Sequence, residues 1–428
     1  MIFIYNILIF IVKIGLPIAA HINPKARLWL DGRKDILKKI DNKIADINLK
    51  NASPLPIKRF WIHVASLGEF EQGRPLIEAI KNENPQHQII LTFFSPSGYE
   101  IRKNYPLADG IFYLPLDTAD IATRFLDIIK PDIAIFVKYE FWYHYLRILK
   151  QKGIPTLLVS GIFRAKQFAW WSPYSYFFKK MLTCFTHFFV QNTPSVLTLK
   201  KHRFENVTQA GDTRIDRVRN IPNEGKRFDV IEKFVENAPV FVCGSTWEAD
   251  ENVILPLLQD AEFQDWAYIF APHDISKSNI ERLVKSLPQQ AILYSDFEKN
   301  GAKIPNIFPK ILIIDNVGML SALYRYGRIA YIGGGFGKGI HNTLEPIAFD
   351  LPVLFGTKYA KFEEANHLIE TGGAFSIANY NQFRACMVAL NEASHYEKSA
   401  MAARQYILDN QGATQRIMDY IRNTDGTD

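Results

Sequence analysis

Two glutamates in the first half of the chain follow predicted buried strands and could take part in acid–base chemistry. Glu69 comes after the apolar run Phe60–Val64 and a break at Ser66, where a helix is expected to begin, and Glu140 comes after the apolar run Ile133–Val137. The C-terminal edge of a parallel sheet is the usual position of active sites. Free N–H groups at a helix start keep a carboxylate ionised, so it can take a proton from a hydroxyl group. The alternative is that these carboxylates only stabilise a helix or pair with a neighbouring cation.

A candidate phosphate-binding region lies in the second half of the chain. Gly244-Ser245-Thr246 ends a predicted strand and precedes a predicted helix, so its hydroxyl and N–H groups can hold a phosphate. The glycine-rich run at 333–339 leads into a helix expected to start near Asn342, and its spacing fits neither the dinucleotide motif nor the P-loop. We expect this loop to hold a phosphate, with Glu345 accepting hydrogen bonds from ribose hydroxyls. A tight structural turn is the alternative.

The elements around these residues alternate between short apolar runs and helical patterns, which predicts parallel, doubly wound sheets. Helices are expected at Glu69–Lys81 and Thr118–Ile129, among others. The first series of strands is expected at Phe60–Val64, Gln88–Phe93, Ile111–Leu114, Ile133–Val137, Thr156–Ser160 and His187–Val190. The second series is expected at Val240–Cys243, Ala267–Phe270, Ala291–Tyr294, Ile311–Ile314, Ile329–Ile332 and Pro352–Phe355. The chain therefore reads as two Rossmann-like halves, an organisation that dehydrogenases, epimerases and binding proteins share.

The 428 residues are too many for one ordinary core, and breaks in the strand–helix rhythm predict the boundaries of the parts. We expect a membrane anchor at 1–20, a basic juxtamembrane region at 21–50, a first Rossmann-like domain at 51–219, a linker at 220–235, a second Rossmann-like domain at 236–395 and a C-terminal helix at 396–428.

The first 20 residues are apolar apart from Asn6, Lys13 and Pro17, and a bilayer-spanning helix needs ~20 such residues. No basic residue precedes Lys13, unlike in a cleaved signal peptide. Residues 21–50 carry eight Lys or Arg against four Asp or Glu, so the positive-inside rule places the body of the protein in the cytoplasm. A helix that lies in the membrane interface is the alternative.

A second basic stretch at 160–203 has seven Lys or Arg, no acidic residue and many aromatic residues. Within it, Trp170-Trp171 and Tyr174–Phe178 are expected to contact lipid. The net charge of +6 is too modest to indicate nucleic acid, and three distant cysteines fit a reducing compartment. No His-Glu-x-x-His or Asp-x-Asp motif is present, so a metal site is not expected.

The segment Trp61–Phe70 resembles the first motif of the Kdo transferases, which move 3-deoxy-D-manno-octulosonic acid (Kdo) from CMP-Kdo onto a lipid A precursor. The resemblance implies an α/β fold of the GT-B type, in which two Rossmann-like domains face each other across a cleft, here with an N-terminal apolar membrane segment. In this family the glutamate of the Ser-x-Gly-Glu motif is the catalytic base, and it maps onto Glu69. Glu140 falls in the second acidic motif, whose glutamate assists the transition state. Arg214 stands where the family has a lysine, and a cation there would stabilise charge on the leaving phosphate or the Kdo carboxylate.

The second half resembles the CMP-Kdo-binding domain of the family, with departures. Trp247 replaces a histidine, Pro272-His273 stands where the family has Pro-Arg-His, and Thr343 replaces a proline. The resemblance implies that CMP-Kdo is bound by Ser245, Thr246, Pro272, His273, Gly318, Met319, Leu320, Gly335, Gly337, Asn342, Thr343, Leu344 and Glu345.

The resemblance thus implies an inverting Kdo transferase of lipopolysaccharide core biosynthesis at the inner (cytoplasmic) membrane, with its catalytic domains on the cytoplasmic face. CMP-Kdo would be the donor, a lipid A precursor like lipid IVA the acceptor, and an anionic membrane surface a further partner. No cofactor, metal or nucleic acid is expected. Two alternatives stay open: another GT-B transferase that uses a UDP-sugar on a lipid acceptor, and a membrane-tethered nucleotide-binding protein without catalysis.

Overall fold

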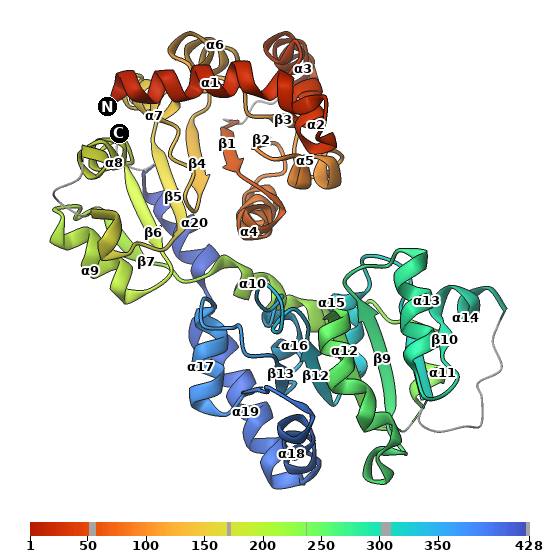
Figure 1. Cartoon of the computed structure of the whole chain (residues 1–428). Helices are drawn as coiled ribbons and strands as arrows, with labels where there is room; N and C mark the ends of the chain where they lie inside the picture. Colours follow the sequence, from red (N-terminus) through yellow and green to blue (C-terminus); the bar gives the residue numbers. More distant parts are fainter. Residues whose placement is uncertain (51–56, 169–172, 237, 301–309, 425–428) are drawn as a thin grey trace. The chain divides into compact units, whose positions relative to one another are not determined.

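The computed structural model describes residues 1–50, 57–168, 173–236, 238–300 and 310–424, which form two compact units. The first unit comprises Met1–Asp216 together with Gln411–Asp428, and the second comprises Arg217–Asn410. Each unit is built on a parallel sheet that helices cover (Figure 1). The two-part α/β organisation predicted from the strand–helix alternation is confirmed.

The first unit has a seven-stranded sheet in the order β3-β2-β1-β4-β5-β6-β7, and all of its strand pairs are parallel. The inner strand β1 aligns His63 with Thr92 of β2 on one side and with Phe136 of β4 on the other. This register brings the C-terminal ends of the strands to one edge of the sheet. The strands are β1 Arg59–Val64, β2 Gln88–Phe93, β3 Gly110–Tyr113, β4 Ile133–Val137, β5 Thr156–Gly161, β6 His187–Val190 and β7 Val207–Gln209.

The helices of the first unit are α1 Ile2–Ala20, α2 Pro24–Gly32, α3 Ile36–Lys50, α4 Leu67–Glu83, α5 Pro96–Arg102, α6 Ala119–Ile129, α7 Tyr143–Gln151, α8 Pro173–Leu182, α9 Thr193–Lys201 and α20 Ala413–Thr424, and α10 Thr213–Asn220 leads into the second unit. Side chains alternate between the faces of a strand, so the sheet has two cores. Trp61 and Phe136 pack with α3, α6, α7 and α8, whereas Phe60 and Ile135 pack with α4 and α20.

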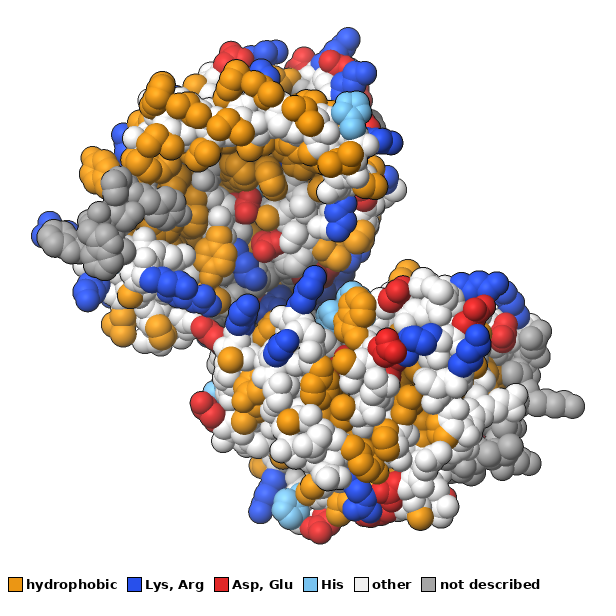
Figure 2. Space-filling view, viewed as in Figure 1, with side chains coloured by type: hydrophobic (Ala, Val, Ile, Leu, Met, Phe, Trp, Pro, Cys, Tyr) orange, Lys and Arg blue, Asp and Glu red, His pale blue; other side chains and the backbone are white. Residues whose placement is uncertain are grey.

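The apolar helix α1 lies on the outside of the first unit, where its side chains form a band of exposed hydrophobic surface (Figure 2). Its length and composition would allow it to cross a membrane. The next thirty residues were expected to be a basic region beside the membrane. They form α2 and α3, and Ile40, Ile44 and Ile47 of α3 are buried in the core of the unit.

The second unit has a seven-stranded parallel sheet in the order β10-β11-β9-β8-β12-β13-β14. Its strands are β8 Val240–Thr246, β9 Ala267–Pro272, β10 Ile292–Leu293, β11 Lys310–Ile313, β12 Ile329–Ile332, β13 Val353–Phe355 and β14 Ala374–Ser376. Its helices are α11 Asp229–Val235, α12 Glu248–Ile254, α13 Lys277–Ser286, α14 Tyr294–Asn300, α15 Leu320–Leu323, α16 Leu344–Ile347, α17 Glu363–Thr371, α18 Tyr380–Asn391 and α19 Ala393–Asn410.

Two local expectations are wrong. The C-terminal stretch is not one helix, because the chain breaks at Gly412, where φ is +90°, so that α19 belongs to the second unit and α20 to the first. In the aromatic stretch, Tyr174–Phe178 was expected to contact lipid. Phe177 and Phe178 are only 5% and 2% exposed and pack in the core of the unit, whereas Tyr176 is 74% exposed. The pair Trp170-Trp171 lies outside the described residues.

Candidate active site

Glu69 lies in the first turn of α4, directly after β1, at the position predicted from the sequence. Ser66 precedes the helix in an extended conformation, and its carbonyl accepts a hydrogen bond of 3.0 Å from the N–H of Phe70. The Ser66 hydroxyl donates a short hydrogen bond to the Glu69 carboxylate, which is half-buried. Ser66 therefore holds the carboxylate at the C-terminal edge of the sheet, where it remains accessible to a substrate hydroxyl.

Glu140 is held by two side chains from the same edge of the sheet. Its Oε2 lies 2.9 Å from Nε2 of His63 and accepts a hydrogen bond of 2.8 Å from Nε1 of Trp142. His63 is fully buried in β1, whereas the Glu140 side chain is 14% exposed. Because charge-assisted hydrogen bonds in a dry environment are strong, these partners fix the carboxylate while one side of it stays open.

His63 was missed in the sequence analysis, although it stands three residues before Ser66. Its Nδ1 lies 2.9 Å from the hydroxyl and 3.2 Å from the carbonyl oxygen of Thr92. The Thr92 hydroxyl also accepts a hydrogen bond of 2.8 Å from Nε1 of Trp61. The position of His63 as a polar residue inside an apolar strand could have indicated it, because a buried imidazole needs hydrogen-bond partners.

Arg214 is not a lone cation, because Asp212 accepts three hydrogen bonds from it. The Nε and one Nη of Arg214 donate to Oδ2 of Asp212 at 2.9 and 2.6 Å, and the backbone N–H of Arg214 donates to Oδ1 at 3.0 Å. Burial alone would raise the pKa of Asp212, but the charge and hydrogen bonds of Arg214 hold that pKa below its usual range. Asp212 thus stays ionised and orients the guanidinium group.

Further contacts tie these elements together at one edge of the first sheet. The Thr213 hydroxyl donates a hydrogen bond of 2.6 Å to the carbonyl of Gln72 and lies 3.2 Å from the hydroxyl oxygen of Ser160. Gln72 is one turn after Glu69 in α4, and Ser160 is at the end of β5. Glu69, Glu140 and Arg214 therefore follow β1, β4 and β7, respectively, and lie at the C-terminal edge of one sheet.

In the second unit, the end of β8 packs closely against Tyr324. A Cβ atom on Gly244 would lie 2.1 Å from the Tyr324 hydroxyl oxygen, so only glycine fits there. Burial, and after it the charge of Glu345, raises the pKa of Tyr324 well above its usual range. Ser245 follows with a positive φ of +53°, and Thr246 donates a hydrogen bond of 3.1 Å to the buried Glu251.

The glycine-rich loop packs directly on the end of β8. A Cβ atom on Gly333 would lie 2.1 Å from the Ser245 carbonyl oxygen, and one on Gly335 would lie 2.5 Å from the backbone nitrogen of Gly356. The N–H of Gly334 donates to the buried Asp250 at 2.9 Å. Burial raises the pKa of Asp250, and the hydrogen bonds that it accepts oppose this shift.

The helix expected after this loop is only one turn long, α16 Leu344–Ile347. The N–H groups of Gly337 and Gly339 are used by the carbonyl of Gly334, at 2.9 and 3.2 Å. The Asn342 side chain caps the turn: its Oδ1 accepts from the N–H of Leu344 at 3.1 Å, and its Nδ2 donates to Glu345 at 3.0 Å. Asn342 therefore holds the Glu345 carboxylate in place.

An aromatic stack with two histidines stands beside this loop. His273 stacks between Trp247 and His341, with ring centroids 4.6 and 4.4 Å apart. Nε1 of Trp247 donates a hydrogen bond of 3.2 Å to Nε2 of His341. Burial, and after it the charge of His273, lowers the pKa of His341 to about 4, so its imidazole is neutral and can accept this bond.

The remaining residues predicted to bind CMP-Kdo lie near the same strand ends. Pro272 pairs with Thr246 at the end of β9, and Leu320 would contact a Cβ atom on Gly244. Gly318 has a φ of +89°, which favours glycine. The other predicted residues, listed by burial, are the exposed Gly337, the half-buried Asn342 and the buried Met319, Gly335, Thr343 and Leu344. Within the described residues, no group of three or more His, Cys, Asp or Glu could hold a metal ion.

Residues 38–217 match the family described as 3-deoxy-D-manno-octulosonic-acid transferase (kdotransferase). The 3-deoxy-D-manno-octulosonic acid transferase of Haemophilus influenzae is 26% identical over 386 residues, which cover 87% of this chain and 88% of that protein. The enzyme of the same name from Aquifex aeolicus is 26% identical over 351 residues, which cover 81% of this chain and 87% of that protein.

Solved structures show the fold. The UDP-GlcNAc 2-epimerase of Neisseria meningitidis has a TM-score of 0.60 at 15% identity, covering 85% of this chain and all of that one. MurG of Acinetobacter baumannii has a TM-score of 0.52 at 11% identity, covering 86% of this chain and all of that one. Residues 38–217 therefore resemble the Kdo transferase family, most of the chain is similar in sequence to 3-deoxy-D-manno-octulosonic acid transferases, and its fold is of the GT-B type.

Proposed function

We propose that this protein is an inverting glycosyltransferase that moves Kdo from CMP-Kdo to a hydroxyl group of a lipid A precursor in lipopolysaccharide biosynthesis. One observation carries the proposal: the segment that matches the Kdo transferase family contains both Glu69 and Glu140, and these follow neighbouring strands at one edge of the same sheet. The relatives from Haemophilus influenzae and Aquifex aeolicus, which match most of the chain, both bear this enzyme name.

Glu69 acts as the general base in the proposed reaction. Its carboxylate takes the proton of the acceptor hydroxyl, and the hydroxyl oxygen attacks the anomeric carbon of Kdo from the face opposite the phosphate. The new C–O bond forms as the bond from that carbon to the phosphate oxygen breaks, and CMP leaves with the electron pair. The hydrogen bond from Ser66 keeps the carboxylate in position before the acceptor arrives.

Glu140 and Arg214 supply charge in this proposal. Glu140 assists the transition state, and His63 with Trp142 fixes its orientation. Arg214 stabilises negative charge on the leaving phosphate or on the Kdo carboxylate, because oriented charges act strongly in a site that excludes water. Its planar fork replaces the point charge of the lysine expected in this family.

The second unit binds the nucleotide of CMP-Kdo in this proposal. Glu345 accepts hydrogen bonds from the ribose hydroxyls, supported by Asn342. Ser245 and the close-packed loop around Gly335 approach the phosphate, because residues without bulky side chains let a ligand come near the backbone. The turn at Gly318 lies beside this region and contacts the base.

The acceptor and the location belong to the same proposal. The apolar helix α1 and the cations that follow it favour attachment to the inner membrane, with both units on the cytoplasmic face. A lipid A precursor would then be available in the same membrane, and its phosphates would suit the basic surface.

The deciding experiment incubates the full chain with CMP-Kdo and a lipid IVA-like precursor and measures product mass. A gain of one or more Kdo units, abolished in Glu69→Gln, is the expected result. CMP should inhibit and UDP should not. Transfer from a UDP-sugar instead would support a different GT-B activity, and CMP binding without transfer would support a non-catalytic nucleotide-binding protein.

A further inference from the structure

Polar and aromatic contacts hold the apolar helix α1 against the first unit. The Tyr5 hydroxyl donates a short hydrogen bond to Asp117, which is 1% exposed. The Tyr5 ring packs on Phe177, with ring centroids 5.7 Å apart. One residue later, Oδ1 of Asn6 lies 2.7 Å from Nε2 of His144. These contacts align α1 with α7 and with the start of α6.

Docking covers only a narrow stripe of α1. Ile9 and Ala20 are buried, and Tyr5 and Leu16 are half-buried. These spacings fall on one face of a helix. Elsewhere the helix exposes the apolar side chains Phe3, Ile4, Ile7, Leu8, Phe10, Ile11, Val12, Ile14 and Ile18. A helix that is apolar all round and docked on one side needs an apolar medium for its other sides.

A helix that crosses the bilayer does not fit these contacts. If α1 crossed while docked, α7 and Asp117 would enter the hydrocarbon with it. If α1 crossed alone, Asp117 and His144 would lose their hydrogen-bond partners in α1. Asn6 and Lys13 would also have to enter the hydrocarbon. A helix that lies flat in the interface keeps its contacts with the unit and gives its apolar sides to lipid.

We propose that α1 lies in the plane of the membrane interface, docked on the first unit, and that its exposed sides insert into a leaflet that contains anionic phospholipid. The lipid surface is thus the partner of the hydrophobic band in Figure 2. A hollow of the same unit opens beside this band and contains acidic side chains. With α1 in the plane of the membrane, this hollow lies next to the lipid, where a lipid-borne hydroxyl would be presented.

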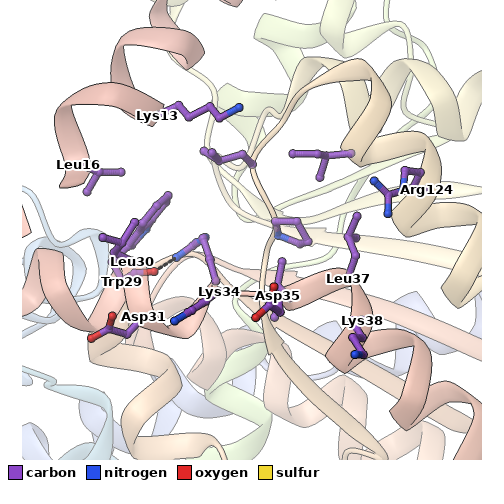
Figure 3. Close-up of a pocket in the computed structure, with 15 residues that line it drawn as sticks. Lys13, Leu16, Trp29, Leu30, Asp31, Lys34, Asp35, Leu37, Lys38 and Arg124 are labelled. Carbon is purple, nitrogen blue, oxygen red and sulfur yellow. Dashed lines mark hydrogen bonds between the residues drawn. The ribbon is translucent and has the colours of Figure 1, made fainter.

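A pocket beside α1 explains why the lipid should be anionic. It has a volume of about 780 Å³, and α1, α2, α3 and α6 contribute to its lining. Lys13 extends from α1 on one side and Arg124 faces it from α6, with Lys34 and Lys38 on the α2–α3 side (Figure 3). Five cations and two carboxylates line the pocket. Because these cations lie beside a helix at headgroup depth, they are attracted to the net negative charge of anionic headgroups.

Depth measurements with spin labels test the proposal. The background is Cys184→Ser with Cys386→Ser, which leaves the fully buried Cys243 unlabelled. Single cysteines then replace the exposed Ile4, Leu8, Ile11 and Ile18 as label positions. In vesicles of neutral and anionic phospholipid, an in-plane helix should give four similar, shallow depths. A crossing helix rises ~1.5 Å per residue, so its first and last labels would differ by ~21 Å. A graded depth through the bilayer centre would overturn the proposal.

A matched pair of lysine variants tests the anionic partner. Lys38 and its neighbour Lys39 are both exposed, but only Lys38 lines the pocket. Lys38→Ala, alone and with Lys34→Ala, should weaken binding to anionic vesicles several-fold at low salt and leave binding to neutral vesicles unchanged. Lys39→Ala should have a smaller effect. Equal losses from Lys38→Ala and Lys39→Ala would remove the pocket from the contact. None of these measurements uses the sugar donor. A failure of the proposal for α1 can therefore be distinguished from a failure of the proposed Kdo transfer.

Discussion

Nε2 of His63 lies 2.9 Å from Oε2 of Glu140, although 77 positions separate the two residues in the chain. His63 is fully buried in the inner strand β1, and its Nδ1 lies 2.9 Å from the Thr92 hydroxyl. Glu140 is therefore positioned by a group that the sheet itself fixes. A site carboxylate with such support keeps its geometry without help from the substrate.

His63→Gln is expected to lower kcat by ~10–100-fold, since a hydrogen bond to a charged group contributes ~1.5–3 kcal/mol. The KM for CMP-Kdo should change little, because His63 only positions Glu140. Steady-state kinetics and thermal unfolding measure both effects. His87→Gln, at the opposite edge of the same sheet, is the matched control. If the two variants lost equal activity, general destabilisation and not Glu140 would be the cause.

Glu69→Gln is expected to keep the fold and CMP binding but to lose ~10²–10⁴-fold in turnover, the usual cost of removing a general base. Glu71→Gln is the matched control, because Glu71 lies two residues away in the same helix and pairs with Arg102 at 2.9 Å. Turnover assays with CMP-Kdo and acceptor compare the two. Near-normal turnover of Glu69→Gln would contradict the assignment of the base.

Local sequence patterns predicted the parts of the fold that depend on neighbouring residues. The strands Gln88–Phe93, Ile133–Val137 and Ile329–Ile332 have the predicted bounds, because continuous apolar runs suit strands buried on both faces. The edge strands β7 and β14 were missed, since three residues each carry too little pattern. The position of Glu69 at a helix start was likewise predictable.

Contacts between distant segments were not predictable from local pattern. The pairing of His63 with Glu140 depends on β1 lying beside β4, which no spacing along the chain reveals. The same holds for the contact of Tyr5 with Asp117, 112 positions apart. By contrast, Asp212 is only two residues from Arg214, so this pairing is of a kind that local sequence can suggest, although it was not predicted.

Glu345→Ala is expected to weaken CMP binding by ~1–3 kcal/mol, the usual cost of leaving buried polar groups without a partner. Its carboxylate is held by Asn342 at 3.0 Å and lies near Tyr324. Calorimetry with CMP measures the effect. Glu370→Ala, an exposed carboxylate in α17, should bind CMP normally. Unchanged affinity of the Glu345 variant would remove this residue from the proposed site.

The His341 pKa of about 4 predicts a pH dependence of stability. The folded state resists protonation of His341, so the stability that depends on its neutral form is fully present above about pH 6.5 and is lost as the pH falls toward 4. Protonation would also break the hydrogen bond from Trp247. Thermal unfolding at pH 7.5 and 5 should show a smaller difference in Tm for His341→Gln, which can still accept this bond. An equal difference in both proteins would contradict the prediction.

Serine substitutions on the two sides of α1 are expected to have opposite consequences. Ile4→Ser, Leu8→Ser and Ile11→Ser act on exposed side chains. Each should weaken vesicle binding by about 1 kcal/mol, since a side chain only partly inserted in lipid gives part of its full burial energy, and each should leave Tm unchanged. Ile9→Ser acts on the docked stripe. It should lower Tm, because it places a hydroxyl among apolar neighbours, and should change vesicle binding little.

Vesicle flotation and thermal unfolding of the four variants separate the two arrangements of α1. In a helix that crosses the bilayer, Leu8 and Ile9 face the same hydrocarbon, and their serine variants would lose binding equally without a difference in Tm. In a helix docked in the interface, neighbouring positions divide between lipid and protein. The sign of the difference between Leu8→Ser and Ile9→Ser therefore reports where each side of α1 lies, without reference to any substrate.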